Sequence, residues 1–133
     1  MPQEDKYMNK FVTKRLIPIN RLNIYAEDKT LLEDMDLAIL ISSLIFEMLK
    51  KNIKPVLDFE GIEKISPYWL VLSLLKFILK TGGRVNEIIG VVNMSTNQLK
   101  LLNIVAKECW QNGEEILQGT VTSSLPNDDI EEL

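Results

Sequence analysis

The sequence contains no histidine and only one cysteine, Cys109. It therefore has no imidazole to act as a general base, to carry a phosphoryl group or to complete an ordinary zinc site, and one thiol cannot supply the missing ligands. It also lacks the G-x-x-x-x-G-K-[ST] and G-x-G-x-x-G phosphate-binding motifs. We expect a chain that is not an enzyme, with no catalytic residue, metal or cofactor. Since Cys109 cannot form an internal disulfide, a reducing, cytoplasmic location is favoured.

Long hydrophobic runs and clustered basic residues are also missing. Lys, Glu or Ser interrupts each apolar run well before the roughly 18 residues that a membrane span needs, and the N-terminus lacks the pattern of a secretory leader. The net charge is −4 and the pI is about 4.9. Because nucleic-acid binding requires a clustered basic face, we expect neither a nucleic-acid partner nor a membrane partner.

What the sequence does contain is enough apolar material for one domain. Of its 133 residues, 46% are hydrophobic, and a chain of this size buries about two-thirds of its unfolded surface on folding. We expect a single domain over residues 1–122. Residues 123–133 are rich in Asp and Glu and are expected to form a flexible acidic tail.

Hydrophobic periodicity predicts alternating strands and helices in an α/β fold. The expected strands are 11–17, 22–26, 55–59, 87–92 and a short final one at 115–117. The expected helices begin at a capping box at 30–33, at Pro67 and at a second capping box at 95–98, and they end near Asn52, Lys80 and Gly113. The predicted order is ββαβαβα(β), and the apolar strand at 56–59 is expected to lie centrally in a sheet of at least four strands.

The segment 55–70 is the most informative part of the chain. An apolar strand ends at Asp58, and Ser66-Pro67 suits a helix start, because a serine hydroxyl can accept an N–H of the first turn and a proline at the first position sacrifices no needed donor. Asp58 and Ser66 should lie at the strand-to-helix edge, where open α/β sheets hold their sites. Asp58 either accepts loop N–H groups or has a functional role, and Ser66 is either a plain cap or an anion contact or phosphosite.

The same segment, D-F-E-G-I-E-K-I-S-P-Y-W-L, followed by an apolar helix and I-I-G-V-V-N-M-S, resembles STAS domains, found in sulfate transporters and anti-sigma factor antagonists. It resembles more closely the STAS-like domain family of unknown function, over roughly Leu31 to Trp110. The resemblance implies a mixed β-sheet with helices packed against it. It also implies a non-enzymatic regulatory protein–protein interaction module, a signalling switch with a histidine-kinase-like ATPase or an anti-sigma type of partner.

The chain departs from the anti-sigma antagonist pattern at the turn itself. Where those proteins carry Asp-Ser-Ser/Thr-Gly, this sequence has Ser66, Pro67, Tyr68 and Trp69, so that Tyr68 stands at the position of the phosphorylated residue. Phosphorylation of Ser66 or of Tyr68 stays open at this point.

The helix expected at 67–80 has apolar residues on two stripes, and it therefore needs cover on two sides. The cover comes either from a neighbouring helix or from another protein or a second copy. We predict an interaction or switch surface with distal Leu75 and Leu79 covered by the chain's own helices. Its predicted members are Asp58, Ser66, Tyr68, Trp69 and Leu72. The alternatives are a small-ligand or nucleotide-binding module at the Asp58/Ser66 edge and a homo-oligomeric scaffold such as a homodimer. An enzyme would need a base that this histidine-free chain does not show.

Overall fold

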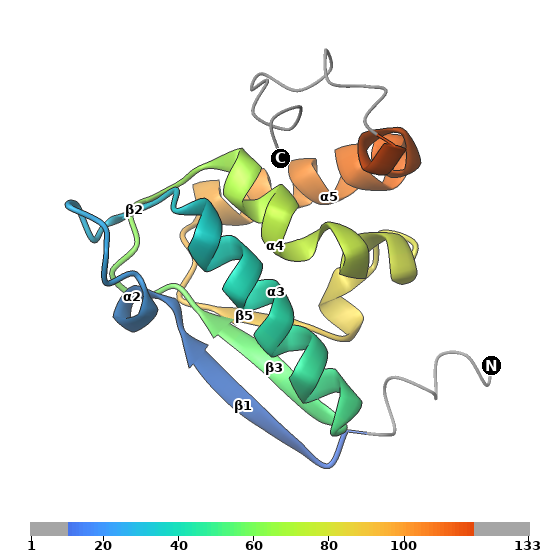
Figure 1. Ribbon diagram of the computed structural model, residues 1–133, viewed down its shortest axis with the longest axis horizontal. Coiled ribbons are helices and arrows are strands. Elements are labelled where there is room, and N and C mark those ends of the chain that lie inside the picture. The colour runs from blue at the N-terminus through green and yellow to red at the C-terminus, as the bar shows by residue number, and fades with distance from the viewer. Residues whose placement is uncertain (1–10, 119–133) are drawn as a thin grey trace.

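The computed structural model describes residues 11–118, so the expected acidic tail lies outside the described residues. Its main sheet is built from three parallel strands in the order β1-β3-β5 (Figure 1). The strands are β1 (Thr13–Pro18), β3 (Ile53–Asp58) and β5 (Gly90–Val92). The central position predicted for the apolar strand that ends at Asp58 is therefore confirmed.

The sheet differs from the prediction in size and direction. Within the described part of the chain the main sheet has three strands rather than at least four, and both of its strand pairs are parallel rather than mixed. A separate two-stranded parallel sheet joins β2 (Leu31–Leu32) to β4 (Lys64–Ile65). The α/β class is confirmed.

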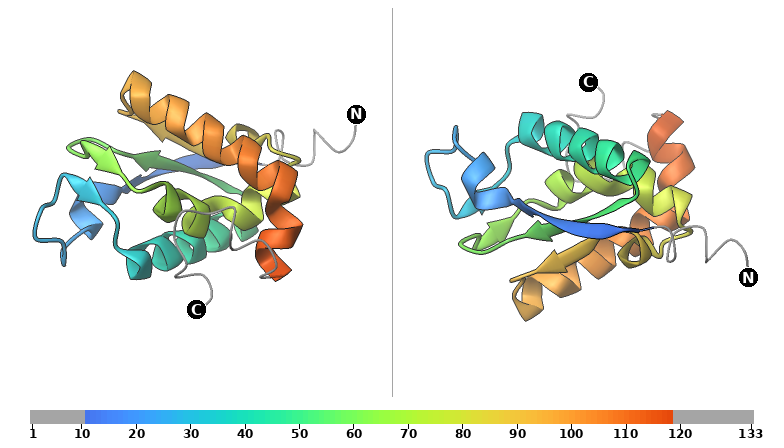
Figure 2. Two further views of the ribbon diagram at one scale, coloured as in Figure 1. Left: turned by 90° about the horizontal axis from the view of Figure 1, so that it is seen from above. Right: turned by 90° about the horizontal axis from the view of Figure 1, so that it is seen from below.

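The connections between the strands explain which side of the sheet is covered. Helix α3 (Met35–Lys50) lies between β1 and β3 in the chain, and α4 (Pro67–Lys80) with the 3₁₀ turn η1 (Val85–Glu87) lies between β3 and β5. Both crossovers step across the sheet in the same direction, and right-handed crossovers of that kind place their helices on the same face. Figure 2 shows α3 on one side of the sheet, while α5 (Thr96–Gln118) packs against α4.

The core lies between this covered face and the helices. Leu57 of β3 and Ile41 of α3 are fully buried, and the rings of Phe59 and Trp69 meet edge to face with centroids 6.4 Å apart. Helix α4 contacts α3 on one side and α5 on the other. Its two apolar stripes are therefore covered largely by the chain's own helices, which is the simpler of the two explanations for its composition.

The bounds of α4 and the start of α5 agree with the prediction. Helix α4 ends at Lys80, and Gly82 and Gly83 follow with φ angles of +67° and +89°, a region that glycine adopts without steric cost. At α5 the predicted capping box forms: the Ser95 N–H donates to Gln98 Oε1 at 2.9 Å, and the Gln98 N–H donates to Ser95 Oγ at 3.1 Å.

The region between β1 and α3 contradicts the prediction. The strand expected at 22–26 is wrong, because the short helix α2 (Ile19–Leu22) is followed by the buried Asn23, whose side-chain amide donates to Leu31 O at 3.1 Å and so holds an irregular loop. The capping box expected at 30–33 is also wrong. Helix α3 begins at Met35, and Asp34 is its cap, with Oδ1 accepting the N–H of Asp36 at 2.9 Å.

Two further boundaries differ at the C-terminal side. Residues 85–87, expected partly as strand, form η1, so β5 is shorter than predicted. Helix α5 continues through residue 113 to Gln118, and the short strand expected at 115–117 is wrong because those residues are helical.

Candidate functional site

The carboxyl ends of the three parallel strands meet at one edge of the sheet, where Pro18, Asp58 and Val92 are in register. Asp58 Oδ1 accepts the Glu60 N–H at 3.0 Å and the Asn93 side-chain amide at 2.8 Å. The first bond closes an Asx turn after β3, and the second ties that turn to the loop after β5. Asn93 has a φ of +62°, a left-handed conformation that asparagine adopts more readily than most residues. One carboxylate thus fixes two loops.

The loop at residues 59–63 is braced from the side of β1 as well. Gly61 has a φ of +85°, and a Cβ added to it would lie 2.8 Å from Asn20 Nδ2. Only glycine allows both this backbone conformation and this close approach. The loop after β3 therefore packs directly on the residues that follow β1.

Helix α5 supports the same loop from a third side. The side chain of Gln98 is buried, and its Nε2 donates to Ile62 O at 2.9 Å and to Glu63 O at 3.1 Å. The Glu63 N–H donates to Thr30 O at 2.7 Å. Glu60 and Glu63 nevertheless remain exposed, so the loop has a fixed backbone and presents charged side chains to solvent.

A shallow depression of about 500 Å³ opens beside Asp58. Its lining residues are Leu16, Pro18, Asn20, Arg21, Asp58 and Glu60. Two carboxylates and one guanidinium are thus gathered around apolar side chains from β1, and Ser66 is not among the lining residues. The predicted Asp58/Ser66 edge is represented in this depression by Asp58 alone.

Ser66 is the N-cap residue of α4 by position, but the predicted hydroxyl cap is wrong, because its side chain forms no capping hydrogen bond. The backbone of Ser66 provides the contacts instead. Its N–H donates to Leu32 O at 2.9 Å, and its carbonyl accepts the N–H groups of Trp69 and Leu70 at 3.0 and 3.3 Å. Ser66 thus links the small β2–β4 sheet to the first turn of α4.

The predicted aromatic contacts lie in the core. Tyr68 is 5% exposed and Trp69 is 0% exposed, while Leu72 is half-buried and packs on the core. Both aromatic side chains are therefore buried, and the Trp69 ring contacts the ring of Phe59 at the start of the loop. Of the predicted site residues, Asp58 therefore contacts the exposed loop directly, while Tyr68 and Trp69 belong to the core.

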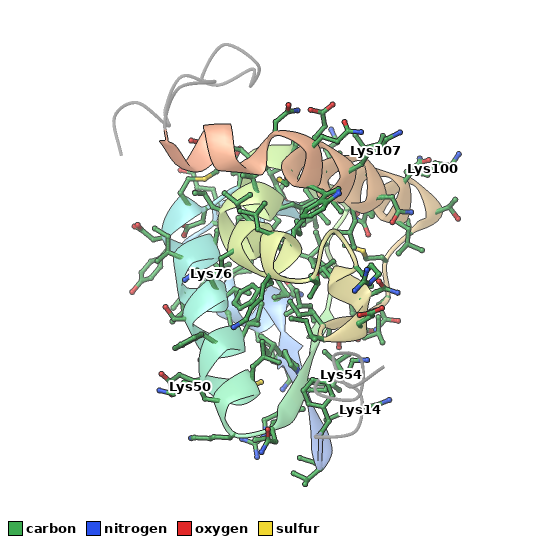
Figure 3. All side chains as sticks on the ribbon, turned by 90° about the vertical axis from the view of Figure 1, so that its right-hand side faces the viewer. Lys14, Lys50, Lys54, Lys76, Lys100 and Lys107 are labelled. Carbon is green, nitrogen blue, oxygen red and sulfur yellow. The ribbon has the colours of Figure 1, made fainter. Side chains whose placement is uncertain are left out.

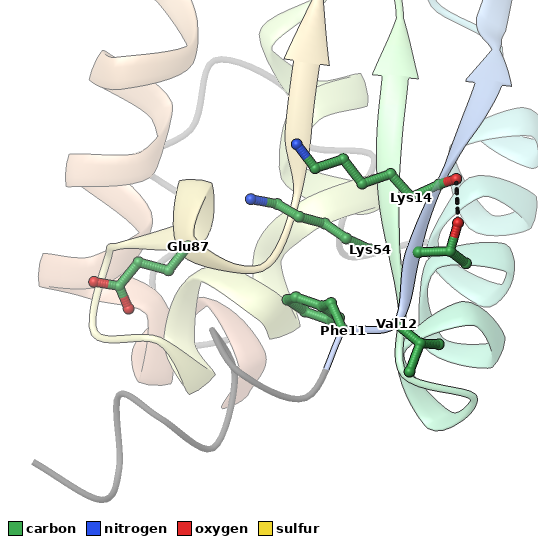
Figure 4. A pocket seen from close by; sticks show the side chains of 6 residues that line it. Phe11, Val12, Lys14, Lys54 and Glu87 are labelled. Atoms are coloured by element: carbon green, nitrogen blue, oxygen red, sulfur yellow. Dashed lines mark hydrogen bonds between the residues drawn. The ribbon is translucent and has the colours of Figure 1, made fainter.

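A second group of side chains lies at the opposite, amino-terminal end of the sheet. Lys14 of β1 and Lys54 of β3 are directly opposite each other in the register. They line a depression of about 290 Å³ together with Phe11, Val12, Thr13 and Glu87 (Figure 4). In Figure 3 the two lysines lie close together, away from Lys50 and Lys76 on the helices. The lysine pair was missed from the sequence, because its detection requires the strand register.

A third depression, of about 360 Å³, follows α2 and carries four carboxylates. Its lining residues are Tyr25, Ala26, Glu27, Asp28, Leu31, Glu33 and Asp34. Two of these carboxylates already have structural partners. The Thr30 hydroxyl and N–H lower the pKa of Asp28 by donating to it at 2.6 and 3.0 Å, and Asp34 caps α3.

The chemistry of the remaining described residues is limited. Residues 11–118 contain no group of three or more His, Cys, Asp or Glu placed to hold a metal ion. In that same range no helix combines the length and the apolar character that crossing a membrane requires. Cys109 is buried, and burial raises the pKa of its thiol to about 11, so it stays protonated at neutral pH.

Comparisons with protein-family models, with curated proteins and with solved structures give no match for this chain. The resemblance to STAS domains therefore stays a prediction based on the segment 58–70 and the strand that follows α4.

Proposed function

We propose that this chain is a non-enzymatic regulatory module that binds another protein through the carboxyl edge of its sheet. The binding surface, called the carboxyl edge below, consists of Asp58, Glu60, Gly61, Glu63 and Asn93. The observation that carries the proposal is the 2.8 Å hydrogen bond from Asn93 to Asp58, which joins the loops after β3 and β5. A surface fixed before binding loses less conformational entropy when a partner docks.

The kind of partner is proposed from the sequence resemblance. A histidine-kinase-like ATPase or an anti-sigma type of protein would fit a STAS-like module in cytoplasmic signalling. A phosphoryl switch at Tyr68 would require the helix start to open, because this side chain is 5% exposed. Ser66 is half-buried and is the more accessible of the two candidate phosphosites.

The test compares two asparagines that share one backbone conformation. Asn93 (φ +62°) lies at the carboxyl edge, and Asn52 (φ +61°) lies at the other end of β3. Glycine tolerates this conformation, so Asn93→Gly removes the bond to Asp58 with little strain, while Asn52→Gly is the matched control. Each purified protein is immobilised and exposed to an extract of the source cells, and bound proteins are identified by mass spectrometry.

A genuine partner is a protein retained by the wild type and by Asn52→Gly but bound several-fold less by Asn93→Gly. The loss of one hydrogen bond to a charged group is sufficient for an effect of about tenfold. Retention that is equal on all three proteins would contradict the assignment of the carboxyl edge as the binding surface.

A second candidate, a small-ligand or nucleotide-binding module, is favoured by the depression of about 500 Å³ beside Asp58. Arg21 is its one cationic lining residue and would be the contact for a phosphate. ATP and GTP are suitable probes. If this candidate is right, either nucleotide raises the melting temperature of the wild type, and Arg21→Ala abolishes the increase. An unchanged melting temperature at millimolar nucleotide eliminates nucleotides as ligands.

A further inference from the structure

The sheet has a second face, opposite α3. Figure 2 shows α5 toward this side, but α5 packs against α4, and the face keeps exposed apolar residues. Side chains alternate between the two faces of a strand, and the residues on this side form what we call the open face. The open face consists of Lys14, Leu16, Lys54, Val56, Asp58 and Val92. Its exposure is evident from Leu16 and Val92, which are 56% and 38% exposed.

The middle of the open face is apolar, and at the β5 side it ends in a glycine, which has no side chain. Leu16, Val56 and Gly90 are neighbours across the three strands. A Cβ on Gly90 would lie 3.3 Å from Val56 Cγ2, so the half-buried valine side chain lies close beside the glycine. An apolar strip of this kind on a sheet is suited to contact with another protein surface.

One end of the open face is positively charged. Lys14 and Lys54 are opposite each other on neighbouring strands, an arrangement that is unfavourable for like charges. Figure 4 shows the two side chains extending next to each other. Neither forms an ion pair with a described residue, since the Glu87 carboxylate in the same depression is bound to Arg84 Nε at 3.0 Å. This end therefore has room for an anionic group.

The other end of the same face is negatively charged. Asp58 ends β3 on this side, and Glu60 follows it in the depression that Leu16 also lines. Arg21 also lines this depression, so its lining residues carry two negative charges and one positive charge. The order along β3 is thus a cation at Lys54, an apolar residue at Val56 and an anion at Asp58.

We propose that the open face is the interface between two copies of this chain. Two sheets pack face to face with their strands roughly aligned. A two-fold axis lying between them and perpendicular to the strands makes the strands of the two copies antiparallel. Lys14 and Lys54 of each copy then face Asp58 and Glu60 of the other, and the apolar middles meet. An axis parallel to the strands would instead bring the lysines of both copies together.

The interface is expected to be weak and dependent on salt. Stable interfaces bury about 800 Å² on each partner, and three short strands offer less area than that. The charged contacts lie at the rim and are screened by salt. The interface shares Asp58 and Glu60 with the carboxyl edge. Its lysines and its apolar middle lie outside that edge, so the dimer can be tested separately from the proposed binding of another protein.

The first experiment measures the mass of the full chain by sedimentation equilibrium over a concentration series at low and high salt. The wild type should pass from monomer to dimer as its concentration rises, and high salt should shift this transition to higher concentrations. Leu16→Asp should remain monomeric, because it places a charge in the apolar middle. Leu40→Asp is the matched control, since Leu40 is 46% exposed on α3, on the opposite side of the sheet.

The second experiment exchanges the charges. Lys14→Glu/Lys54→Glu and, separately, Glu60→Lys should each weaken the dimer about tenfold or more, because each change makes both ends of the interface repulsive. An equimolar mixture of the two variants should form a heterodimer of near wild-type affinity, since both ends are then again attractive. Circular dichroism melts confirm that each variant is folded.

Several outcomes would overturn the dimer. A wild type that is monomeric at every concentration, an equal loss of dimer in Leu16→Asp and Leu40→Asp, or no recovery in the mixture each contradicts it. Asn93→Gly leaves the charges and apolar residues of the open face unchanged. It should therefore keep the dimer while losing a partner at the carboxyl edge, so failure of one proposal is distinguishable from failure of the other.

Discussion

The two faces of the β1–β3–β5 sheet are made by the same strands but differ in solvent exposure. On the covered face Ile17 and Leu57 are 2% and 0% exposed under the helices, whereas on the open face Leu16, the chain neighbour of Ile17, is 56% exposed. Both crossovers place their helices on one side, and the composition of β3 agrees, with Ile53 and Leu57 on the covered face and Lys54 and Asp58 on the open face. The open face is consequently free of core packing, and its residues are available for binding.

The largest expected effect is the difference in free energy of unfolding between a substitution on the covered face and one on the open face. Leu57→Ala removes a fully buried side chain and should lower the free energy of unfolding by about 2–5 kcal/mol. Leu16→Ala should change it by no more than about 0.5 kcal/mol, because its side chain is largely in solvent. Urea denaturation of both variants in dilute protein, where the monomer prevails, measures the difference. Similar losses would show that the open face is covered in solution.

A smaller effect is expected where α5 supports the carboxyl edge. Gln98→Ala leaves the carbonyls of Ile62 and Glu63 without their side-chain donor and removes half of the capping box. The free energy of unfolding should fall by about 1–3 kcal/mol, and amide exchange in residues 59–63 should become faster. Asn103→Ala, at an exposed position of the same helix, is the control. If exchange in this loop is unchanged, the loop does not depend on α5.

The smallest effect concerns the serines at two helix starts. Ser95→Ala removes a hydroxyl that accepts an N–H at 3.1 Å and should cost about 0.5–2 kcal/mol. Ser66→Ala should cost no more than about 0.5 kcal/mol, because its contacts are made by the backbone. Thermal melts of the two variants provide the comparison. A larger loss of stability for Ser66→Ala would show that the Ser66 hydroxyl caps α4, as the sequence pattern predicted.

The sequence predicted best the elements whose signals are local. Pro67 at the start and Gly82-Gly83 after the end were sufficient for both bounds of α4, and Ser95 with Gln98 predicted the start of α5. The error at the start of α3 arises because two residues close in the sequence, Thr30 and Asp34, both suit a helix cap and only one of them has that role. Thr30 suited a capping box, but it binds Asp28 instead, and Asp34 caps the helix.

The candidate site was predicted only in part, for a related reason. The position of Asp58 at the end of an apolar strand pointed to the carboxyl edge, and this location is confirmed. Asn93 was missed, although an asparagine directly after the next strand is a signal that could have been used. Periodicity could not show whether Tyr68 and Trp69 are exposed or buried, because the helix is apolar on most sides. The elements packed around the helix decide which of its sides are buried.

The all-parallel sheet also has a consequence for how the chain folds. Each ladder joins distant parts of the sequence, Thr13 with Ile53 and Val56 with Gly90. Before such strands can pair, the long chain segment between them must be closed into a loop, which costs entropy. Folding is therefore slower than for a sheet built from hairpins. During synthesis β1 leaves the ribosome well before β3 and cannot pair until β3 has followed. The lysine, arginine and proline of β1 therefore protect an unpaired strand from association with other chains in that interval.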